Sequence, residues 1–156
     1  MRQSLIASTP EDTEACGARL AAALPRALPT ALQVQLHGDL GAGKTTLARG
    51  FLAQLGYRGV VRSPTYTLVE SYELGALTVV HADLYRLQDP AEFAGLGLRD
   101  LAIPGHVWLI EWPQRAGTWL PAADLHVTLA AHAAFHSIEM AAASAAGTQW
   151  LARLQA

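Results

Sequence analysis

The spacing of hydrophobic and polar residues changes several times along the chain, and each spacing predicts a different element. Residues 9–24 carry apolar positions at helical spacing behind Thr9-Pro10 and two acids, a pattern typical of an N-capped helix that ends before Pro25. In residues 32–36 apolar and polar positions alternate, which predicts a strand. That strand runs directly into a glycine-rich segment. Residues 45–55 beyond it are again helical in spacing, with Gly56 as the stop.

The rest of the chain alternates strand patterns with weaker helical ones. The fully apolar run of residues 107–111 is typical of a buried parallel strand. The other expected elements are a hairpin of residues 66–73 with 77–82, a weak helix over 90–101 interrupted by Gly95 and Gly97, late strands over 124–130 and 135–142, and a last helix over 148–154. No linker or internal repeat divides the chain. We therefore expect one three-layer α/β domain with a mixed sheet over residues 1–156.

Composition limits the classes of function. Of 156 residues, 51% are hydrophobic and 15% are charged, which fits a compact domain with its own core. The net charge is −2 and no basic stripe is present, so we expect no DNA binding, and we expect a partner to hold any nucleic-acid substrate. The single cysteine, Cys16, excludes an internal disulfide and is expected to be buried. Without a secretory signal or an apolar stretch near about 20 residues, we expect a cytoplasmic protein with no membrane span.

The glycine-rich segment Gly38-Asp39-Leu40-Gly41-Ala42-Gly43-Lys44-Thr45 is a complete G-x-x-x-x-G-K-T sequence. Of the 11 lysine and arginine residues in the chain, Lys44 alone is a lysine. Glycines let backbone N–H groups approach phosphates, and the following helix adds its positive N-terminus. A lysine ammonium is a compact charge that fits between β- and γ-phosphate oxygens, and the Thr45 hydroxyl would ligate Mg²⁺. The preceding strand and following helix supply the required context, so we predict a nucleoside triphosphate site.

Two acids stand where a Mg²⁺-triphosphate site needs them. Asp83 ends the run Val79-Val80-His81-Ala82-Asp83, and Glu111 ends the apolar strand over 107–111. An acid at the end of a strand beside the phosphate loop can hold the metal through water or polarise the attacking water. Either acid alone could equally be a solvated carboxylate at a strand end. In a chain with this loop, the two acids together predict a metal role for at least one of them.

Several further residues are open to two interpretations. The segment Ser63-Pro64-Thr65 is either a plain turn or a mobile segment in which Thr65 senses the γ-phosphate and its Mg²⁺. Trp112 is either a core residue or stacks on the base. Arg86 is either a surface salt-bridge former or an internal arginine finger. His132 and His136 lie in strand-like sequence, where their spacing disfavours a zinc site.

Four motifs together resemble the TsaE (YjeE) family, the small P-loop ATPases of bacterial tRNA threonylcarbamoyladenosine (t6A) biosynthesis. In chain order they are Gly38-Asp39-Leu40-Gly41-Ala42-Gly43-Lys44-Thr45-Thr46, Ser63-Pro64-Thr65-Tyr66-Thr67-Leu68-Val69-Glu70, His81-Ala82-Asp83-Leu84-Tyr85-Arg86-Leu87 and Ile110-Glu111-Trp112-Pro113. The first motif is generic, but the other three in this order are specific to the family. The resemblance runs from about Thr9 to Val127, and the part from Ala130 onward is not distinctive. Ala82 is a departure, because many members carry a bulkier residue there.

The resemblance implies a P-loop NTPase-like fold that binds ATP and Mg²⁺. It implies slow hydrolysis in support of a TsaB–TsaD complex, which forms t6A in tRNAs that read ANN codons. TsaD would perform the transfer chemistry, and tRNA would be reached only through that complex. Lys44, Asp83 and Glu111 would act in hydrolysis, and Thr45 with the two acids would hold the metal. The implied nucleotide contacts are Asp39, Leu40, Gly41, Ala42, Gly43, Lys44, Thr45, Thr46 and Trp112, with Thr9 or Thr13 at the adenine.

Other functions use the same loop. A small-molecule kinase needs an acceptor pocket, often under an arginine-rich lid, but the arginines here are scattered from Arg2 to Arg153. A GTP-dependent switch would read guanine with an Asn-Lys-x-Asp motif, which a single lysine at Lys44 excludes. A nucleotide-regulated binding module differs little from a slow ATPase, because slow hydrolysis can serve only to time an interaction. The kinase therefore stays as the alternative, and we expect ATP rather than GTP.

Overall fold

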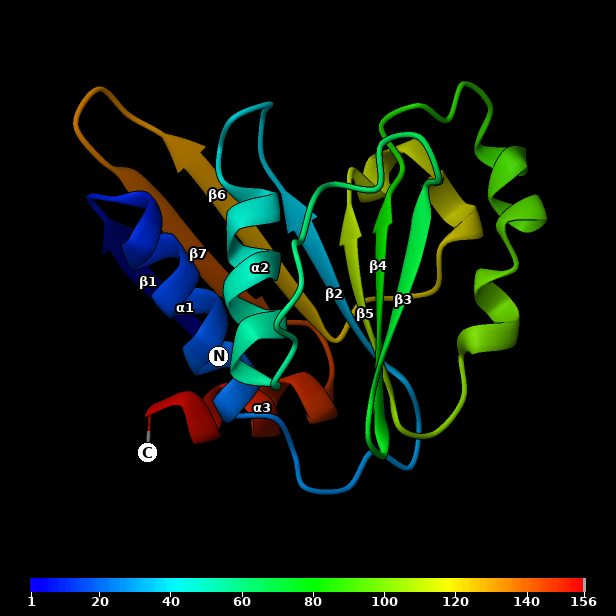
Figure 1. Ribbon diagram of the computed structural model, residues 1–156, viewed down its shortest axis with the longest axis horizontal. Coiled ribbons are helices and arrows are strands. Elements are labelled where there is room, and N and C mark those ends of the chain that lie inside the picture. The colour runs from blue at the N-terminus through cyan, green and yellow to red at the C-terminus, as the bar shows by residue number, and fades with distance from the viewer. Residues whose placement is uncertain (156) are drawn as a thin grey trace.

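The computed structural model describes residues 1–155, whose strands form one twisted mixed sheet (Figure 1). Seven strands of this part of the chain lie in the order β1-β7-β6-β2-β5-β4-β3. Their bounds are β1 Arg2–Ala7, β2 Leu32–His37, β3 Val69–Leu74, β4 Leu77–Asp83, β5 His106–Glu111, β6 Leu125–Ala131 and β7 His136–Ala142. Strand β2 runs parallel to both neighbours, and the outer strands pair antiparallel. The predicted mixed sheet is confirmed.

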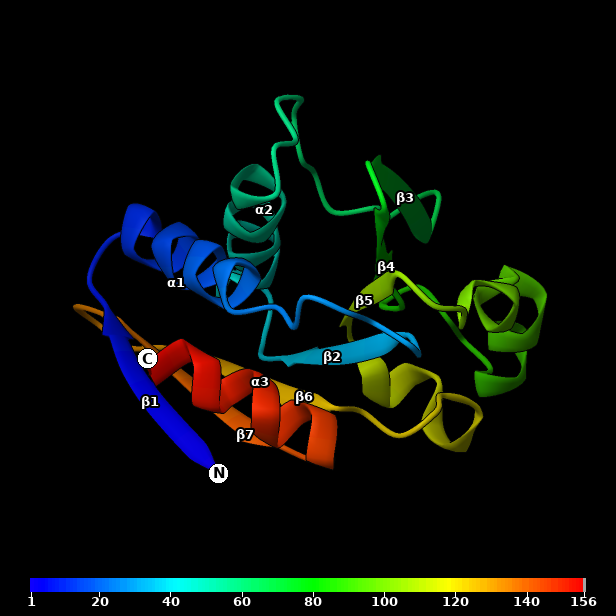
Figure 2. The same ribbon diagram turned by 90° about the horizontal axis from the view of Figure 1, so that it is seen from below.

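Helices and 3₁₀ segments cover the sheet on two sides, which gives the three layers that the sequence predicts. Figure 2 shows α1 and α2 together on one side of the sheet and the 3₁₀ segments beside β4 and β5 on the other. The α-helices are α1 Pro10–Ala22, α2 Lys44–Gln54 and α3 Ala145–Gln155. The 3₁₀ segments are η1 Pro90–Leu96, η2 Leu98–Leu101, η3 Pro113–Arg115 and η4 Gly117–Trp119. None of the helices within residues 1–155 has the length and apolar character to cross a membrane.

Strand β5 separates two hydrophobic cores. Its Val107 and Leu109 face the large core under α1 and α2, whereas Trp108 and Ile110 face a smaller core under the 3₁₀ segments. Successive residues of a strand point to opposite faces, so an all-apolar strand must be covered on both sides. This explains why the run over 107–111 lacks any alternation. The arrangement leaves the acid at the end of β5 to emerge at the carboxyl edge of the sheet.

Helix α1 packs directly against α2 through small residues. A Cβ on Gly17 would clash with the Leu47 carbonyl oxygen, and one on Gly50 would clash with the Glu14 carbonyl oxygen. Each helix backbone therefore comes closer to the other than a side chain would allow. The predicted helix start is confirmed, because Thr9 caps α1 in a capping box with Asp12. The close contact places the first turn of α1 beside the glycine-rich loop.

The structure differs from the sequence expectations at three places. Residues 66–68 form a turn rather than a strand, because the Leu68 N–H donates to the Pro64 carbonyl and Leu68 has φ of 65°. The weak helix over 90–101 is two 3₁₀ pieces, separated at Gly97 with φ of 72°. Strand β1 was not predicted. It is an edge strand with mostly exposed residues, so its sequence lacks the apolar alternation that would predict a strand.

Candidate functional site

The glycine-rich loop connects the carboxyl end of β2 to the start of α2. Gly38 and Gly43 have φ of 144° and 104°, a region that side-chain-bearing residues avoid. A Cβ on Gly38 would also clash with the Leu129 carbonyl oxygen of β6. Helix α2 begins at Lys44, so its first N–H groups lie at the loop, where an anion is favoured.

Lys44 is the buried cation of this loop, with only 6% of its surface exposed. Its Nζ donates to the carbonyl oxygens of Gly38 and Asp39, the latter at 2.9 Å. Burial lowers the pKa of Lys44, and this is only partly offset by the negative charges of Glu111, Asp83 and Asp39. The lysine therefore holds its ammonium group within the loop and near acidic side chains, where a phosphate oxygen could replace the carbonyl groups.

The structure brings the two strand-end acids together beside the loop. Asp83 of β4 and Glu111 of β5 are register partners on adjacent parallel strands, with exposed fractions of 6% and 2%. The Thr45 hydroxyl donates to Glu111 Oε1 at 2.8 Å, and the Tyr85 N–H donates to Asp83 Oδ1 at 2.9 Å. Two nearly buried carboxylates this close together repel each other and favour a cation between or beside them.

Ser63 bridges the two acids, whereas Thr65 is the residue of this segment that the sequence suggested as a sensor of the γ-phosphate and its Mg²⁺. The Ser63 hydroxyl contacts the Asp83 carboxylate and lies 3.1 Å from Glu111 Oε2. Its single hydrogen can be donated to only one of them at a time. The Thr65 hydroxyl donates to Ser63 Oγ at 3.3 Å and so reaches the acids indirectly. The signal was present in the sequence, because Ser63 opens the segment that contains Thr65.

His81 is a site residue that sequence reasoning missed, although it begins the motif that contains Asp83. It is fully buried, and no hydrogen-bond partner for either ring nitrogen is found within residues 1–155. Its Nε2 lies 3.8 Å from Glu111 Oε2. Burial alone would raise the pKa of Glu111, but His81 and the hydroxyls of Thr45 and Ser63 favour the charged carboxylate. The net pKa of Glu111 therefore lies below its ordinary value.

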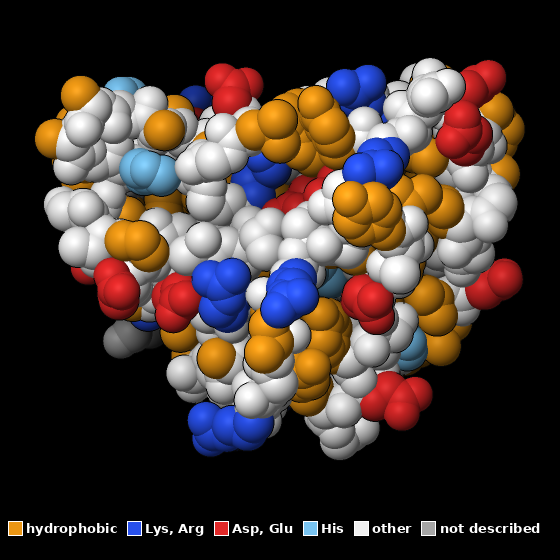
Figure 3. Space-filling model, turned by 45° about the horizontal axis from the view of Figure 1, so that its top comes forward, with side chains coloured by type: hydrophobic (Ala, Val, Ile, Leu, Met, Phe, Trp, Pro, Cys, Tyr) orange, Lys and Arg blue, Asp and Glu red, His pale blue; other side chains and the backbone are white. Residues whose placement is uncertain are grey.

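Lys44, Thr45, Ser63, Asp83 and Glu111 line one cavity of about 260 Å³ at the carboxyl edge of the sheet. Figure 3 shows the hollow with basic and acidic side chains inside it and hydrophobic side chains at its rim. Its lining consists of Leu40, Gly41, Gly43, Lys44, Thr45, Thr46, Ser63, Thr65, Asp83, Glu111 and Trp112. Within residues 1–155 no group of three or more His, Cys, Asp or Glu side chains could hold a metal. A metal here would thus need ligand or water oxygens as well as protein oxygens, which is how Mg²⁺ usually binds.

Trp112 follows Glu111 and lies over the loop lysine. Its ring centroid is 4.4 Å from Lys44 Nζ and 4.9 Å from the Tyr85 ring. Trp112 has a φ of 57°, a left-handed conformation that is unusual for a bulky residue. It immediately precedes the 3₁₀ segment that begins at Pro113. Arg86 does not line this cavity, because its guanidinium stacks on Tyr66 at 4.3 Å.

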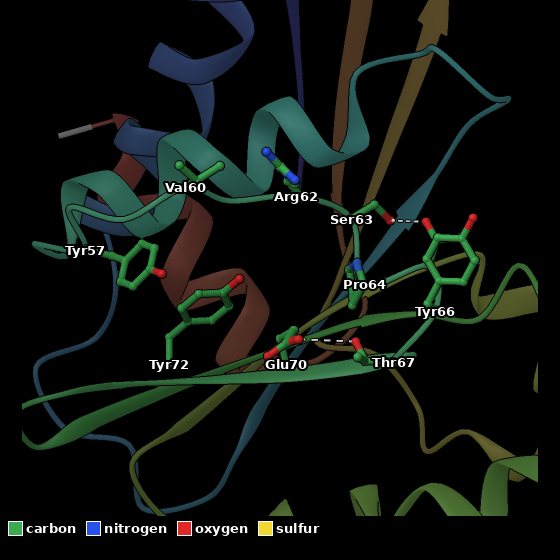
Figure 4. A pocket seen from close by; sticks show the side chains of 10 residues that line it. Tyr57, Val60, Arg62, Ser63, Pro64, Tyr66, Thr67, Glu70 and Tyr72 are labelled. Atoms are coloured by element: carbon green, nitrogen blue, oxygen red, sulfur yellow. Dashed lines mark hydrogen bonds between the residues drawn. The ribbon is translucent and has the colours of Figure 1, made fainter.

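The segment over residues 57–67 lies beside a second, larger cavity. This cavity, of about 460 Å³, lies between the segment and β3, and Figure 4 shows Tyr57 beside Tyr72 and Arg62 on the opposite side from Glu70. Ser63 and Thr65 line both cavities. Both residues are only partly buried, whereas Pro64 between them is buried.

Two threonines expected at the base lie on the opposite side of the loop from the acids. Thr9 and Thr13 line a third cavity, of about 190 Å³, together with Gly41, Gly43, Thr46 and His136. Asp39 and Leu40 are exposed at the outer side of the loop, and Ala42 is buried beneath it. His136 is a second residue that sequence reasoning missed as a site residue. In the sequence, His136 stands out only together with His132, as a pair whose spacing disfavours a zinc site. In the structure the two rings have different hydrogen-bond partners.

Comparisons with known proteins agree with one another. The family model described as "Threonylcarbamoyl adenosine biosynthesis protein TsaE" matches residues 7–138. The tRNA threonylcarbamoyladenosine biosynthesis protein TsaE of Haemophilus influenzae is 46% identical over 112 residues, which cover 72% of this chain and 71% of that protein. The Bacillus subtilis protein of the same name is 40% identical over 120 residues, covering 77% and 72%. The crystal structure of Bacillus subtilis YdiB superposes with a TM-score of 0.78 at 27% identity, covering 99% of this chain and 95% of that one.

Proposed function

Because this chain belongs to the TsaE family of threonylcarbamoyl adenosine biosynthesis proteins, we propose that it binds ATP with Mg²⁺ over the loop and hydrolyses it slowly in support of t6A formation. One observation carries the proposal. A buried lysine and two buried, register-paired acids face the same cavity beside a phosphate-binding loop. A cation for the phosphates and acids for the metal and water are the parts that triphosphate hydrolysis requires.

The loop and Lys44 would bind the phosphates. The N–H groups at the start of α2 would face the phosphates, and Lys44 Nζ would exchange the Gly38 and Asp39 carbonyl oxygens for phosphate oxygens. Trp112 would lie beside the bound phosphates, since its ring already covers Lys44. Burial of Lys44 helps here, because a charge–charge interaction is stronger in a partly buried site than in open water.

The residues around Thr45 fit a magnesium ion. The Thr45 hydroxyl and the carboxylates of Asp83 and Glu111 are hard oxygen donors, which are the ligands that Mg²⁺ prefers. When bound, Mg²⁺ would neutralise negative charge that develops on the phosphate oxygens. We assign Glu111 to the metal side because it already bonds the Thr45 hydroxyl. Asp83, one strand farther from the loop, would orient the water that attacks the γ-phosphate.

The contacts of Ser63 explain why turnover would be slow without a partner. Ser63 ties the segment over 57–67 to both acids, and these acids must be free to act on metal and water. A partner that held this segment in another position would release the acids and speed hydrolysis. The cavity on its far side leaves room for such a movement. Hydrolysis would then time the interaction rather than perform the modification itself.

The proposed partners are TsaB and TsaD, with tRNA reached only through their complex. The net charge of −2 supports this arrangement, because a chain that bound tRNA alone would be expected to show a basic surface. The chain would supply a nucleotide-dependent step, and TsaD would carry out the transfer to tRNA. DNA and membranes have no place in this proposal.

Co-purification tests this function. The full chain would be mixed with TsaB and TsaD in the presence of Mg²⁺ with ATP or with ADP, and complex formation and phosphate release would be measured. We expect a complex whose stability differs between the two nucleotides, and phosphate release that rises when both partners are present. Nucleotide-independent association with no phosphate release would overturn the proposal. Steady ATP consumption driven by an added small-molecule acceptor, without partners, would favour the kinase alternative.

A further inference from the structure

The cavity of about 190 Å³ lies on the side of the loop away from the acids. Gly41, Gly43 and Thr46 line this cavity and also line the cavity that contains Asp83 and Glu111. A nucleotide whose phosphates cross the loop would therefore have its γ-phosphate beside the acids. Its base and ribose would lie toward this second cavity.

The second cavity is lined by uncharged groups. Thr13 is 2% exposed, and a Cβ on Gly43 would lie 3.4 Å from Thr13 Cγ2 and 3.7 Å from His136 Nδ1. The Thr13 methyl group and the His136 ring thus both lie against Gly43. The Thr9 hydroxyl accepts from the Asp12 N–H at 3.2 Å and is engaged in capping α1. Beside the hydroxyl side chains of Ser8, Thr9, Thr13 and Thr46, the imidazole of His136 is the aromatic ring that lines this cavity.

A backbone contact fixes the tautomer of His136. Its Nδ1 lies 2.9 Å from the Ala42 carbonyl oxygen. A carbonyl oxygen can only accept a hydrogen bond, so Nδ1 must carry the hydrogen. In the neutral ring, Nε2 then keeps a lone pair and acts as an acceptor. Among the hydrogen bonds within residues 1–155, Nε2 of His136 has no partner.

We propose that His136 reads the base, with its Nε2 accepting a hydrogen bond from the exocyclic amino group of adenine. This inference rests on the proposed function. Adenine presents an amino donor where guanine presents a keto oxygen, which is an acceptor. An acceptor that faces another acceptor leaves both unpaired, and such a mismatch discriminates strongly between ligands. The loop itself, through Ala42, would thus set the preference for ATP over GTP.

His136 also holds the loop, so the two effects must be separated. A variant that lost the bond to Ala42 could weaken every ligand that touches the loop, whatever its base. Inorganic triphosphate has no base and reports the loop alone. Purine riboside triphosphate has the ring of adenine without the amino group and reports the proposed hydrogen bond alone.

The test measures binding of four ligands, each with Mg²⁺, to the full chain by titration calorimetry. They are ATP, purine riboside triphosphate, GTP and inorganic triphosphate. The variant is His136→Ala, and the control is His132→Ala. His132 bonds the Ser137 hydroxyl at 3.0 Å and stacks on Phe135, and it does not line the cavity.

We expect the unsubstituted chain and His132→Ala to bind ATP about tenfold more tightly than purine riboside triphosphate, which is the size expected for one hydrogen bond. The His136→Ala variant should bind these two ligands equally and lose most of its preference for ATP over GTP. Its affinity for inorganic triphosphate should stay within about twofold.

Three outcomes would overturn the assignment. They are equal binding of ATP and purine riboside triphosphate by the unsubstituted chain, an unchanged preference in His136→Ala, or a loss of inorganic triphosphate affinity in that variant as large as the loss for ATP. If the unsubstituted chain bound neither inorganic triphosphate nor any nucleotide, the proposed function would fail and this inference with it. Normal triphosphate binding without a preference among bases would refute the role of His136 alone.

Discussion

Strand β2 divides the sheet into two sides that meet the same loop in different ways. On the β5 and β4 side, Glu111, Asp83 and His81 bring buried charge and polarity to the loop lysine. On the β6 and β7 side the contacts are neutral, with the Leu129 carbonyl against Gly38 and the His136 ring on the Ala42 carbonyl. One side is built to hold charge that a metal and phosphates would balance. The β6 and β7 side fixes the shape of the loop and, by the proposal for His136, would select the base through neutral groups.

The largest expected effect comes from removing the charge of Lys44, which lies in the loop that both sides of the sheet meet. Lys44→Ala should weaken Mg²⁺–ATP binding about 100-fold or more, because charge-assisted bonds to phosphate oxygens are lost. Calorimetry or equilibrium dialysis would measure the affinity. Lys44→Arg is the matched variant. It keeps the charge but should also bind poorly, because the guanidinium fork is too broad for the space beneath the Trp112 ring. Full affinity in Lys44→Arg would show that charge alone suffices.

The second largest effect separates the role of the two acids in hydrolysis from the binding of the nucleotide. Asp83→Asn and Glu111→Gln should each lower the rate of ATP hydrolysis about 100-fold or more while nucleotide affinity changes only a few-fold. The acids act on metal and water, whereas the loop and Lys44 hold the phosphates. Phosphate release and nucleotide titration would be measured on the same preparations. Glu73→Gln, an exposed acid of β3, serves as the control and should keep the original rate. Equal hydrolysis rates in all four proteins would contradict this division of roles.

The charged side was largely predictable from the sequence because its signals are local. A phosphate loop between a strand and a helix, and acids at the ends of two apolar strands, follow from short segments. Parallel strands bring their carboxyl ends to one edge of the sheet, so both acids were expected at that edge, and the adjacency of β4 and β5 then makes Asp83 and Glu111 register partners. The start of α1 was equally predictable, because its N-cap Thr9 and the acids of its first turn are adjacent in the sequence, and Thr9 and Asp12 form a capping box.

The neutral side and the bridging serine could not be predicted in the same way. The contact between His136 and Ala42 joins residues 94 positions apart, and that between Ser63 and Glu111 joins residues 48 positions apart. Such pairings depend on strand order, which a pattern of apolar positions does not specify. His81 was missed for another reason. It occupies a buried strand position where the pattern leads one to expect an apolar residue, and only its neighbour Glu111 accounts for it.

A smaller expected effect distinguishes the Ser63 hydroxyl from the Thr65 hydroxyl as the group that acts on Asp83 and Glu111. Ser63→Ala should change the hydrolysis rate about 5- to 10-fold, because it removes the hydroxyl that contacts both carboxylates. Without a partner the rate should rise, since Ser63 then no longer ties the segment to the acids. Thr65→Val is the comparison and should have a smaller effect, because Thr65 reaches the acids only through Ser63. A larger effect from Thr65→Val would return the sensing role to Thr65.

The smallest effect concerns the pH dependence of stability. The pKa of Glu111 is lower in the folded chain than in the unfolded chain, so its carboxylate contributes stability above its ordinary pKa and loses it as pH falls through the folded value. The free energy of unfolding of Glu111→Gln should therefore fall below that of the unsubstituted chain near neutral pH and converge with it in acid. Urea unfolding at a series of pH values measures this. A constant gap across the series would mean that packing, not charge, causes the loss. Glu73→Gln should show no such trend.

The most direct test of the account is t6A formation by TsaB and TsaD over many rounds, with Mg²⁺ and ATP, in three parallel reactions. One contains this chain, one contains Glu111→Gln, and one lacks the protein. We predict that only the first sustains t6A formation, while Glu111→Gln still binds nucleotide and allows at most about one round per complex. Equal yields in all three reactions would contradict the claim that ATP hydrolysis in this cavity supports the modification.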